Sequence, residues 1–575
     1  MAFASLQDSN DVVHLEKLLL RDPDTNVRQA AAYAIGQTPG LNSEQVLFKA
    51  CRNETNESVL EELLEAYGKV SREWKVNLLP ENSKLSRALA WSYYRMAVRG
   101  VSNEDLNSKA IELLKSPDSS TRLGAAHYFA RGAKDFMLHE KRLIETAKND
   151  PSAEVRMAAI LSLRKIKSDS SRLASAYCIK NDPDYRVRVN AIRVLEDFPL
   201  DLTKNILFQA LQDSNNNVGV AASETIKNTI SKEHWTALIS KARESKHWRI
   251  QANLFEAALS VSDHKELAEE IRSVYNTTSN PYQKAALLTA LQHSIMSYGF
   301  VREQLLNNRE PVIKVAAASS LVGMNHRENF DPVLRPQFAQ SYREAINDGD
   351  AAVIGIITDA LADPTLDYKS ILKDYTFLKD ARNKLSLPKD FEAILPLERA
   401  LAFFEGKKIP SAPKNEFNHP IPWNFVRRIP VDQKAVIHTS RGDITIRLLV
   451  QEAPGSVANF VTLALRKYYD DKFFHRVVPN FVIQGGCPRG DGWGSEDYSI
   501  RSEFLPHPYK TGSVGMASAG KDTEGTQWFI THSPTPHLEG RYTLFAEVDE
   551  GMDIVHEIEV GDRIVSVEII NFNPF

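Results

Sequence analysis

Two different spacings of apolar residues divide this chain. From the first residue to about residue 375, apolar positions follow the 3.6-residue period of amphipathic helices, and the whole pattern returns about every 32 residues. After about residue 431 the period becomes 2, which is typical of strands with one buried face. The pattern therefore predicts a region of helical repeats followed by a strand-rich domain.

Each helical unit carries a short signature that is clearest in residues 150–159. An Asp-Pro pair is followed by a valine, an arginine and two alanines, and an aliphatic residue recurs at Val155, Val187, Val218 and Ile250, at spacings of 32, 31 and 32. Because the residue before a proline avoids the helical region, Asp-Pro predicts a turn, and the next Asp or Ser predicts a helix cap. We expect the valine to point inward and the arginine outward. The units resemble short HEAT-type repeats, of which about ten are expected to stack into an α-solenoid with a concave surface.

The arginine that returns in each unit has two interpretations. It could form a basic stripe for acidic partners, or it could pair with the acidic residue of the next unit and serve only the stack; we favour the second. The repeats contain no constellation that predicts catalysis, so their expected role is to bind a protein partner. Packing between helices is favoured over partner binding for five aromatic residues: Trp91, Tyr93, Tyr94, Trp235 and Trp248.

The first residues match the end of a repeat. Residues 2–7 align with residues 32–37, which end the second helix of a unit. Half a repeat cannot bury its apolar face, so we expect Phe3 and Leu6 to be partly exposed and the natural protein to start further upstream. No signal peptide precedes the first periodic segment, but one could have been lost with that part.

Residues 376–430 are predicted to connect the two regions. Residues 389–406 have a helical pattern despite Pro396, and Trp423 and Phe425 are expected to dock on one of the domains. A high density of proline forbids helix or central strand and predicts an extended, stiff connector. The prolines are Pro410, Pro413, Pro420, Pro422 and Pro430.

Strand and turn signals fill residues 431–575. Residues 435–439 and 444–449 alternate as strands, with a hairpin turn at 440–443. Residues 454–465 have a helical pattern, and residues 564–570 favour a final strand. Mostly strands with two helices is consistent with a closed barrel.

The candidate chemistry lies in residues 474–486, Phe-His-Arg-Val-Val-Pro-Asn-Phe-Val-Ile-Gln-Gly-Gly. The apolar residues predict a buried strand wall. An arginine beside such a wall keeps its charge, so Arg476 must face water, a carboxylate or a ligand. Gln484, eight residues later, adds a neutral donor and acceptor.

These residues resemble the signature of the cyclophilins, which are peptidyl-prolyl cis-trans isomerases. Further blocks at 515–520, 525–530 and 538–545 follow in family order and at family spacing. The resemblance covers about residues 431–575. It implies a closed eight-stranded β-barrel with two helices and the isomerase activity of a bacterial-type member.

The resemblance also implies a role for each site residue. Rotation about an X-Pro bond has a barrier of about 18–20 kcal/mol. The prolyl nitrogen becomes basic in the twisted transition state, so a fixed cation aimed at it stabilises that state. The implied catalytic residues are Arg476 as this donor, Gln484, which holds the arginine or the substrate carbonyl, and Phe481 in the proline socket. The implied substrate-binding residues are Val482, Ala517, Ser518, Gln527, Phe529, His537, Leu538 and Tyr542.

Four of these positions depart from the common eukaryotic pattern. His537 stands where a tryptophan is usual, Tyr542 for a histidine, Ser518 for an asparagine and Val482 for a methionine. Bacterial members often vary at the first two positions, so activity is still expected. Cyclosporin is expected to bind weakly, because the tryptophan contributes to the drug's site. Cys487, where an aspartate is usual, has no explanation in the sequence.

Composition and charge exclude several other classes. The 575 residues are 43% hydrophobic and 25% charged with a net charge of −4, which gives no reason to expect nucleic-acid binding. No apolar run approaches the ~18 residues of a transmembrane helix. His475, His532 and His537 lack the spacing of a metal site, and the mechanism requires no cofactor. Residues 490–494 lack the lysine and the following helix of a phosphate loop.

The sequence as a whole predicts a peptidyl-prolyl isomerase that assists protein folding. It would act on proline-containing polypeptide clients and bind clients or partners through its solenoid. The alternatives are a scaffold that only binds proline peptides, and a cell-envelope assembly chaperone with incidental isomerase activity. The expected location is the periplasm or cell envelope, with the cytoplasm as the alternative. The predicted domains are 1–375 (solenoid), 376–430 (helix and linker) and 431–575 (isomerase).

Overall fold

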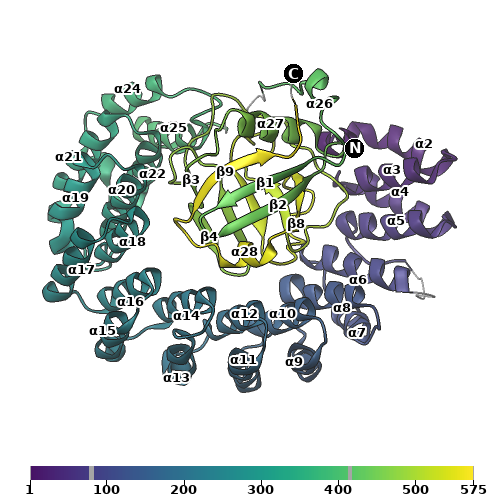
Figure 1. Ribbon diagram of the computed structural model, residues 1–575, viewed down its shortest axis with the longest axis horizontal. Helices are drawn as coiled ribbons and strands as arrows, with labels where there is room; N and C mark the ends of the chain where they lie inside the picture. The colour runs from purple at the N-terminus through teal and green to yellow at the C-terminus, as the bar shows by residue number, and fades with distance from the viewer. Residues whose placement is uncertain (1, 77–82, 412–417, 574–575) are drawn as a thin grey trace. The chain divides into compact units, whose positions relative to one another are not determined.

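The computed structural model describes residues 2–76, 83–411 and 418–573, and they form two compact units. The first unit comprises residues 1–225 together with 503–508 and 533–541. The second comprises residues 226–502, 509–532 and 542–575. Figure 1 colours the chain from purple at the N-terminus to yellow at the C-terminus. Each unit thus combines helical repeats with segments of the C-terminal domain.

Helices of the first unit alternate as the repeat pattern predicts. The Asp-Pro signature precedes α3, α10 and α12, and the cap follows the prediction: Ser152 accepts a hydrogen bond from the Val155 amide at the start of α10. Val155 and Val187 are fully buried, as expected. The helices are α1 (Ala2–Leu6), α2 (Val12–Arg21), α3 (Thr25–Gly36), α4 (Leu41–Asn53), α5 (Glu57–Val70), α6 (Ser83–Ala97), α7 (Glu104–Leu113), α8 (Ser119–His127), α9 (Glu140–Asn149), α10 (Ala153–Ser162), α11 (Asp169–Asn181), α12 (Tyr185–Leu195), α13 (Leu200–Ala210) and α14 (Asn216–Thr229), which extends into the second unit.

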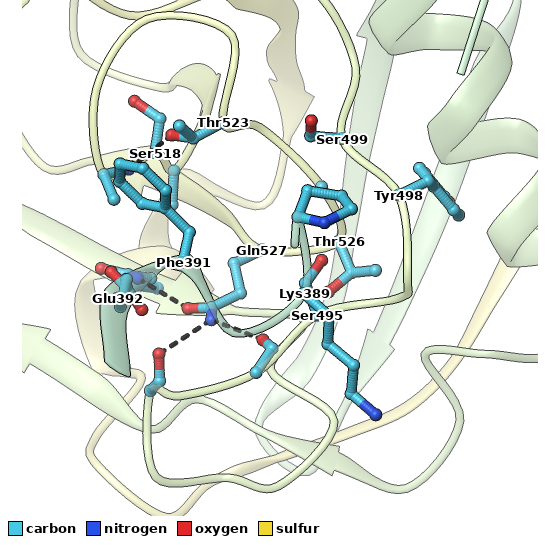
Figure 2. Close-up of a pocket in the computed structure, with 17 residues that line it drawn as sticks. Lys389, Phe391, Glu392, Ser495, Tyr498, Ser499, Ser518, Thr523, Thr526 and Gln527 are labelled. Atoms are coloured by element: carbon cyan, nitrogen blue, oxygen red, sulfur yellow. Dashed lines mark hydrogen bonds between the residues drawn. The ribbon is translucent and has the colours of Figure 1, made fainter. Parts of the chain in front are cut away.

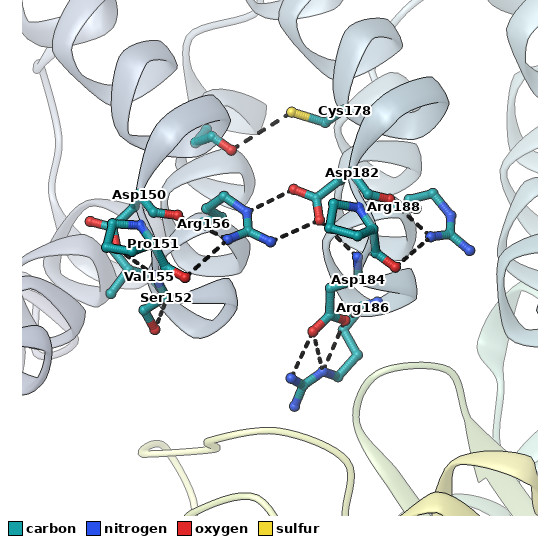
Figure 3. Close-up of polar contacts among 12 residues, drawn as sticks. Asp150, Pro151, Ser152, Val155, Arg156, Cys178, Asp182, Asp184, Arg186 and Arg188 are labelled. Atoms are coloured by element: carbon teal, nitrogen blue, oxygen red, sulfur yellow. Dashed lines mark hydrogen bonds and ion pairs between the residues drawn. The ribbon is translucent and has the colours of Figure 1, made fainter.

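The repeated arginine forms a ladder of ion pairs between successive units. Arg156 Nε lies 2.8 Å from an oxygen of Asp182, and its Nη1 donates to the carbonyl oxygen of Asp150 at 2.9 Å (Figure 3). Arg122 pairs in the same way with Asp150 at 2.7 Å. The prediction of an ion-pair ladder is therefore confirmed. The prediction that the arginine points outward is wrong, because the Arg156 side chain is only 11% exposed and reaches along the stack to the next unit.

Two segments of the C-terminal domain belong to the first unit. The hydroxyl of Tyr33 in α3 donates to the carbonyl oxygen of Leu505 at 2.6 Å. Arg95 in α6 donates to the carbonyl oxygen of Pro536 at 3.1 Å and pairs with Glu539. The segments 503–508 and 533–541 are thus held by buried polar contacts with α3 and α6.

The exposure of the first helix and of the repeat aromatics agrees with expectation. Phe3 and Leu6 in α1 are 39% and 46% exposed. Tyr93 and Tyr94 are buried, and the indole of Trp91 meets the Tyr94 ring edge-on at 5.6 Å. The packing interpretation of these aromatic residues is confirmed for α6.

Helices of the second unit continue the repeat pattern up to the linker. The predicted helix over 389–406 is α25, which contains Pro396. The helices are α15 (Trp235–Glu244), α16 (Trp248–Val261), α17 (Lys265–Thr277), α18 (Pro281–Leu291), α19 (Tyr298–Asn307), α20 (Pro311–Asn325), α21 (Arg335–Asp348), α22 (Ala351–Leu361), α23 (Tyr368–Ile371), α24 (Thr376–Lys384), α25 (Phe391–Glu405), α26 (Trp423–Val426), α27 (Pro454–Leu465) and α28 (Met552–Glu557).

The proline-rich connector is only partly as predicted. Residues 407–411 and 418–422 have no regular structure, whereas residues 423–426 form the short helix α26 directly after Pro422. Proline is tolerated there because the first turn of a helix needs no amide donor. Phe425 docks edge-on against Phe572 at 5.9 Å, but Trp423 is 53% exposed, so its predicted docking is wrong. Pro413 lies outside the described residues.

The C-terminal domain is built on one curled antiparallel sheet of nine strands. The predicted hairpin is confirmed as β1 and β2, and the predicted helix over 454–465 is α27. The strand order is β3-β9-β1-β2-β8-β6-β7-β5-β4. The strands are β1 (Lys434–Thr439), β2 (Gly442–Leu448), β3 (Lys472–Phe473), β4 (Arg476–Val478), β5 (Val482–Gly485), β6 (Ser513–Met516), β7 (Trp528–Thr531), β8 (Leu544–Glu550) and β9 (Arg563–Ile569).

The expected closed barrel of eight strands needs correction. Among the described residues, the outer strands β3 and β4 do not pair with each other. They are consecutive in the chain and separated by Phe474 and His475, whose backbone turns aside. The Phe474 amide donates to the carbonyl oxygen of Asp562 at 2.9 Å, and Phe474 accepts a hydrogen bond from the Gly561 amide at 3.0 Å. The break separates β3 from β4, and the nine strands form a curled sheet.

The core of the sheet surrounds Trp528, which is fully buried. Phe460 of α27 and Phe474 meet the Trp528 indole edge-on at 6.3 and 6.0 Å. This aromatic core holds β4, β5 and β7, the strands that carry the candidate site, against α27. None of the described helices combines the length and the apolar character that a bilayer crossing requires.

Candidate active site

A tight hairpin between β4 and β5 sets the positions of Arg476 and Gln484. Asn480 in the turn has a φ of 51°, in the left-handed region that asparagine tolerates. The register then pairs Arg476 with Gln484 directly across the two strands. A separation of eight residues in the sequence thus becomes side-by-side placement on one face of the sheet.

Arg476 is exposed and makes few contacts. Its Nη1 donates to Gln484 Oε1 at 3.3 Å, and its guanidinium carbon lies 6.0 Å from the centre of the Phe481 ring. No carboxylate among the described residues forms an ion pair with it. Partial burial lowers the pKa of Arg476 and nearby Tyr542 opposes the shift, but a guanidinium stays charged at neutral pH. The site therefore presents a permanent cation that has free donor capacity.

A chain of amides fixes Gln484. Its Nε2 donates to Gln527 Oε1 at 3.1 Å. Gln527 Nε2 in turn donates to the carbonyl oxygens of Gly492 and Gly494, at 2.9 and 3.2 Å (Figure 2). These backbone acceptors fix the orientation of both amides, so that Gln484 directs an oxygen at Arg476.

Phe529 places an apolar ring beside the hydrogen-bonded amides of Gln484 and Gln527. It pairs with Gln484 across β5 and with Gly515 across β6. A Cβ at Gly515 would lie 2.5 Å from the Phe529 ring, so the glycine makes room for it. The ring meets the Tyr542 ring edge-on at 5.9 Å. Val482 is 2% exposed and packs in the core of the sheet.

The second unit brings most of the predicted residues together. Ala517 and Ser518 line a pocket of about 130 Å³ with Gln484 and Gln527. Arg476, Phe481, Val482, Phe529 and Tyr542 lie in the same unit. His537 and Leu538 lie in segment 533–541 of the first unit, and their substrate-binding roles stay predictions. Burial lowers the pKa of His537 to about 3, aided by Arg131 and Arg541, so this imidazole is neutral at pH 7.

Comparison with known proteins agrees with this arrangement. The family model for cyclophilin-type peptidyl-prolyl cis-trans isomerases matches residues 434–571. A peptidyl-prolyl cis-trans isomerase of Synechococcus elongatus is 43% identical over 139 residues, which cover 24% of this chain and 96% of that protein. Peptidyl-prolyl cis-trans isomerase B of Bacillus subtilis is 45% identical over 128 residues, covering 22% of this chain and 90% of the relative.

This chain belongs to the cyclophilin-type peptidyl-prolyl cis-trans isomerases. The resemblance inferred from residues 474–486 is confirmed, and with it the predicted enzyme class. A HEAT repeat model matches residues 5–37, which agrees with the predicted repeats. The matched relatives account for the cyclophilin domain, about a quarter of the chain.

The sequence did not reveal the importance of the loop over residues 487–494 of the cyclophilin domain. Gly490, Gly492 and Gly494 have φ values of 73°, 89° and 85°, in the left-handed region that glycine favours. Two of them supply the carbonyl oxygens that hold Gln527. Their alternation with Asp491 and Trp493 was the available signal.

Cys487 also gains an explanation. Its Sγ lies 3.2 Å from the Trp493 carbonyl oxygen and donates to it across the base of the loop. Burial raises the pKa of this thiol, so it stays protonated as a donor. The cysteine therefore closes the loop.

His475 was also unrecognised as part of the site's support. It lies between the two outer strands, directly before Arg476. Burial lowers the pKa of His475 to about 4, and the neighbouring Arg476 adds to the shift. The imidazole is therefore neutral at pH 7 and adds no second cation beside the arginine.

Proposed function

We propose that this protein isomerises X-Pro bonds in polypeptide clients, with Arg476 as the donor to the prolyl nitrogen. The observation that carries the proposal is the state of Arg476: exposed, held by Gln484 at 3.3 Å and without a carboxylate partner in the described chain. A cation that serves only stability would be expected to find an acid.

The chemistry follows from the electronic structure of the peptide bond. In a planar X-Pro bond the nitrogen lone pair is shared with the carbonyl group, and in the twisted state it becomes available to a donor. A guanidinium fixed at that position binds the twisted state better than either planar state. An acceleration of about 10⁵-fold needs only about 7 kcal/mol of such preference. Phe481 and Phe529 would hold the proline ring.

The helical repeats have a separate proposed role. HEAT repeats offer extended surfaces for proteins, and no catalytic group is expected there. We infer that the repeats bind clients or a protein partner, with solenoid, linker and isomerase bounded as the sequence predicts, at 1–375, 376–430 and 431–575. The periplasmic or cell-envelope location, like its cytoplasmic alternative, stays a prediction that fractionation of the native cell would test.

The test uses the full chain in a protease-coupled assay with an X-Pro peptide. Arg476→Ala should lower kcat/KM by well over tenfold while the circular dichroism spectrum stays the same. Arg447→Ala is the matched control, since Arg447 is an arginine on β2 that pairs with Glu547 away from the site.

Two outcomes would separate the alternatives. A protein that binds the peptide but does not isomerise it would be a proline-binding scaffold, as the alternative holds. Full activity in a folded Arg476→Ala variant would remove the arginine from the mechanism.

A further inference from the structure

The pocket beside Gln484 and Gln527 has a wall that comes from outside the cyclophilin domain, at the start of α25. Besides Gln484, Ala517, Ser518 and Gln527, the pocket is lined by residues within 388–392. These are Pro388 and Lys389, in the turn before α25, and Phe391 and Glu392, in its first turn. Figure 2 shows Phe391 near Ser518 and Gln527. All of these residues belong to the second unit.

An ion pair ties the neighbouring loop to the repeats. Arg489 Nη2 lies 2.8 and 3.0 Å from the two carboxylate oxygens of Asp350, which caps the N-terminus of α22. Arg489 also pairs with Asp491 at 2.8 Å. Because the Asp350 and Asp491 side chains are only 13% and 1% exposed, this cluster of one arginine and two aspartates is shielded from solvent.

Apolar packing fixes the same loop. A Cβ at Gly355 of α22 would lie 2.8 Å from the Trp493 ring and 3.4 Å from the Cα of Ala393 in α25. The indole therefore lies where α22 and α25 approach each other. The loop that holds Gln527 is thus packed against α22, beside α25, the helix that supplies Phe391.

The chemistry of the pocket limits what it can hold. A volume of about 130 Å³ is small beside the ~300–1,000 Å³ of pockets for whole ligands, so it suits one side chain. Much of the lining is polar, and the Ser495 hydroxyl oxygen is buried without a hydrogen-bond partner in the described residues. Lys389 and Glu392 bring opposite charges and give no net preference for a charged side chain. The lining residues that carry a hydroxyl group are Ser495, Tyr498, Ser499, Ser518, Thr523 and Thr526, of which the Ser495 and Thr526 oxygens are themselves buried.

We propose that residues 388–392, at the start of α25 and outside the cyclophilin domain, form one wall of a substrate subsite. The subsite takes a small hydrogen-bonding side chain, such as that of serine or asparagine, on the N-terminal side of the client proline. The Phe391 ring limits the size of that side chain. This inference rests on the proposed isomerase function and adds that the helix before the linker helps to select substrates.

The experiment measures substrate selectivity in the full chain. Peptides carry serine, asparagine, leucine or phenylalanine at each of the two positions before proline, and kcat/KM is measured for each. The wild-type protein should prefer serine and asparagine at one of these positions. Phe391→Ala should admit the larger side chains and narrow that preference about tenfold, the lower end of the size discrimination that an apolar wall provides.

Phe403→Ala is the matched control. Phe403 lies in the same helix with similar exposure and does not line the pocket, so its replacement should leave the preference unchanged. If Phe391→Ala does not fold, Phe391→Leu takes its place, because leucine keeps more of the apolar volume. Its preference should lie between that of the wild-type protein and equal use of all the peptides.

Equal preferences in wild type, Phe391→Ala and Phe403→Ala would overturn the subsite and leave the isomerase function intact. If the wild-type protein isomerises none of the peptides, the proposed function fails. The subsite would then be tested by the peptide dissociation constants from calorimetry, in which Phe391→Ala must narrow the same preference.

Discussion

In the helical repeats, arginine after arginine reaches an acidic residue of the next unit, whereas Arg476 of the cyclophilin domain reaches none in the described chain. Arg122, Arg156 and Arg188 pair with an aspartate 25 to 28 positions later, and each also donates to two backbone carbonyl oxygens before its helix. Arg476 has one amide oxygen at 3.3 Å and the Phe481 ring. The same side chain is saturated in one region and left with free donors in the other.

The contrast shows what separates a structural arginine from one that we propose to be catalytic. In the repeats the acid returns with the period of the sequence, so each guanidinium is neutralised wherever the helices stack. On β4 the opposite residue is neutral Gln484, which orients the cation without cancelling its charge. A cation that acts on a substrate needs an open donor as well as orientation, whereas a cation that holds helices together has its donors occupied.

The largest expected effect concerns the open arginine. Arg476→Ala should reduce kcat/KM by about 10² to 10³-fold, the usual loss when one fixed donor to a transition state is removed. The unfolding temperature should change by little, because the side chain is exposed. A parallel loss of stability would mean that Arg476 has a structural role, as the arginines of the ion-pair ladder do.

Breaking the ion-pair ladder of the repeats should lower stability and leave the isomerase activity nearly unchanged. Arg122→Met leaves Asp150 buried at 5% side-chain exposure without its partner, which should cost about 3 kcal/mol of unfolding free energy. Hydrogen exchange should accelerate in α8 and α10, while kcat/KM for a short peptide changes by less than twofold. Lys109→Met, at the exposed pair with Asp105, is the control and should cost less than about 0.5 kcal/mol. An equal cost in both variants would contradict the structural reading of the ladder.

A third expectation concerns acid. Burial lowers the pKa of His127, which packs beside Trp91 and Tyr94, from 6.5 to about 3. Between these values the unfolded chain binds a proton that the folded chain does not, so stability is full above pH 6.5 and falls as pH drops toward 3.

Urea unfolding of the full chain at pH 7, 6, 5 and 4 should show this slope, and His127→Gln should reduce it by the share of one histidine, because the lowered pKa values of His475 and His537 leave their contributions in place. His14→Gln, at an exposed position of α2, is the control. The isomerase rate should stay level from pH 6 to 8, since Arg476 keeps its charge; a rate that titrates in this range would point to a different catalytic group.

The smallest expected effect tests the link between the two regions. Arg489→Met removes the ion pair with Asp350 and loosens the loop that holds Gln527, which should lower kcat about threefold through a less well fixed Gln484. Arg489→Lys keeps the charge and should restore part of the rate, which a purely structural loss would not show. Unchanged kcat in Arg489→Met would mean that the glycine carbonyls hold Gln527 without help from the repeats.

The sequence by itself determined those features that depend on near neighbours. The alternation of residues 435–449 predicted the hairpin of β1 and β2, the helical pattern of 454–465 matched α27, and the Asp-Pro signature located the starts of α3, α10 and α12. The contact between Gln484 and Arg476 was implied only by the family resemblance, and a tight turn between two short strands produces it. Such features follow from backbone preferences and side-chain periods that act over a few residues.

Only the tertiary structure decided the rest. Arg489 and Asp350 are 139 positions apart, and no local pattern in either segment predicts that they form an ion pair. The pocket wall from residues 388–392 and the membership of segments 503–508 and 533–541 in the first unit are of the same kind. So is the break at Phe474, which depends on the backbone of Gly561 and Asp562 on a distant part of the chain. Contacts across such distances arise from how whole layers pack, where shape and buried area set the partner, and a single sequence carries no period that records them.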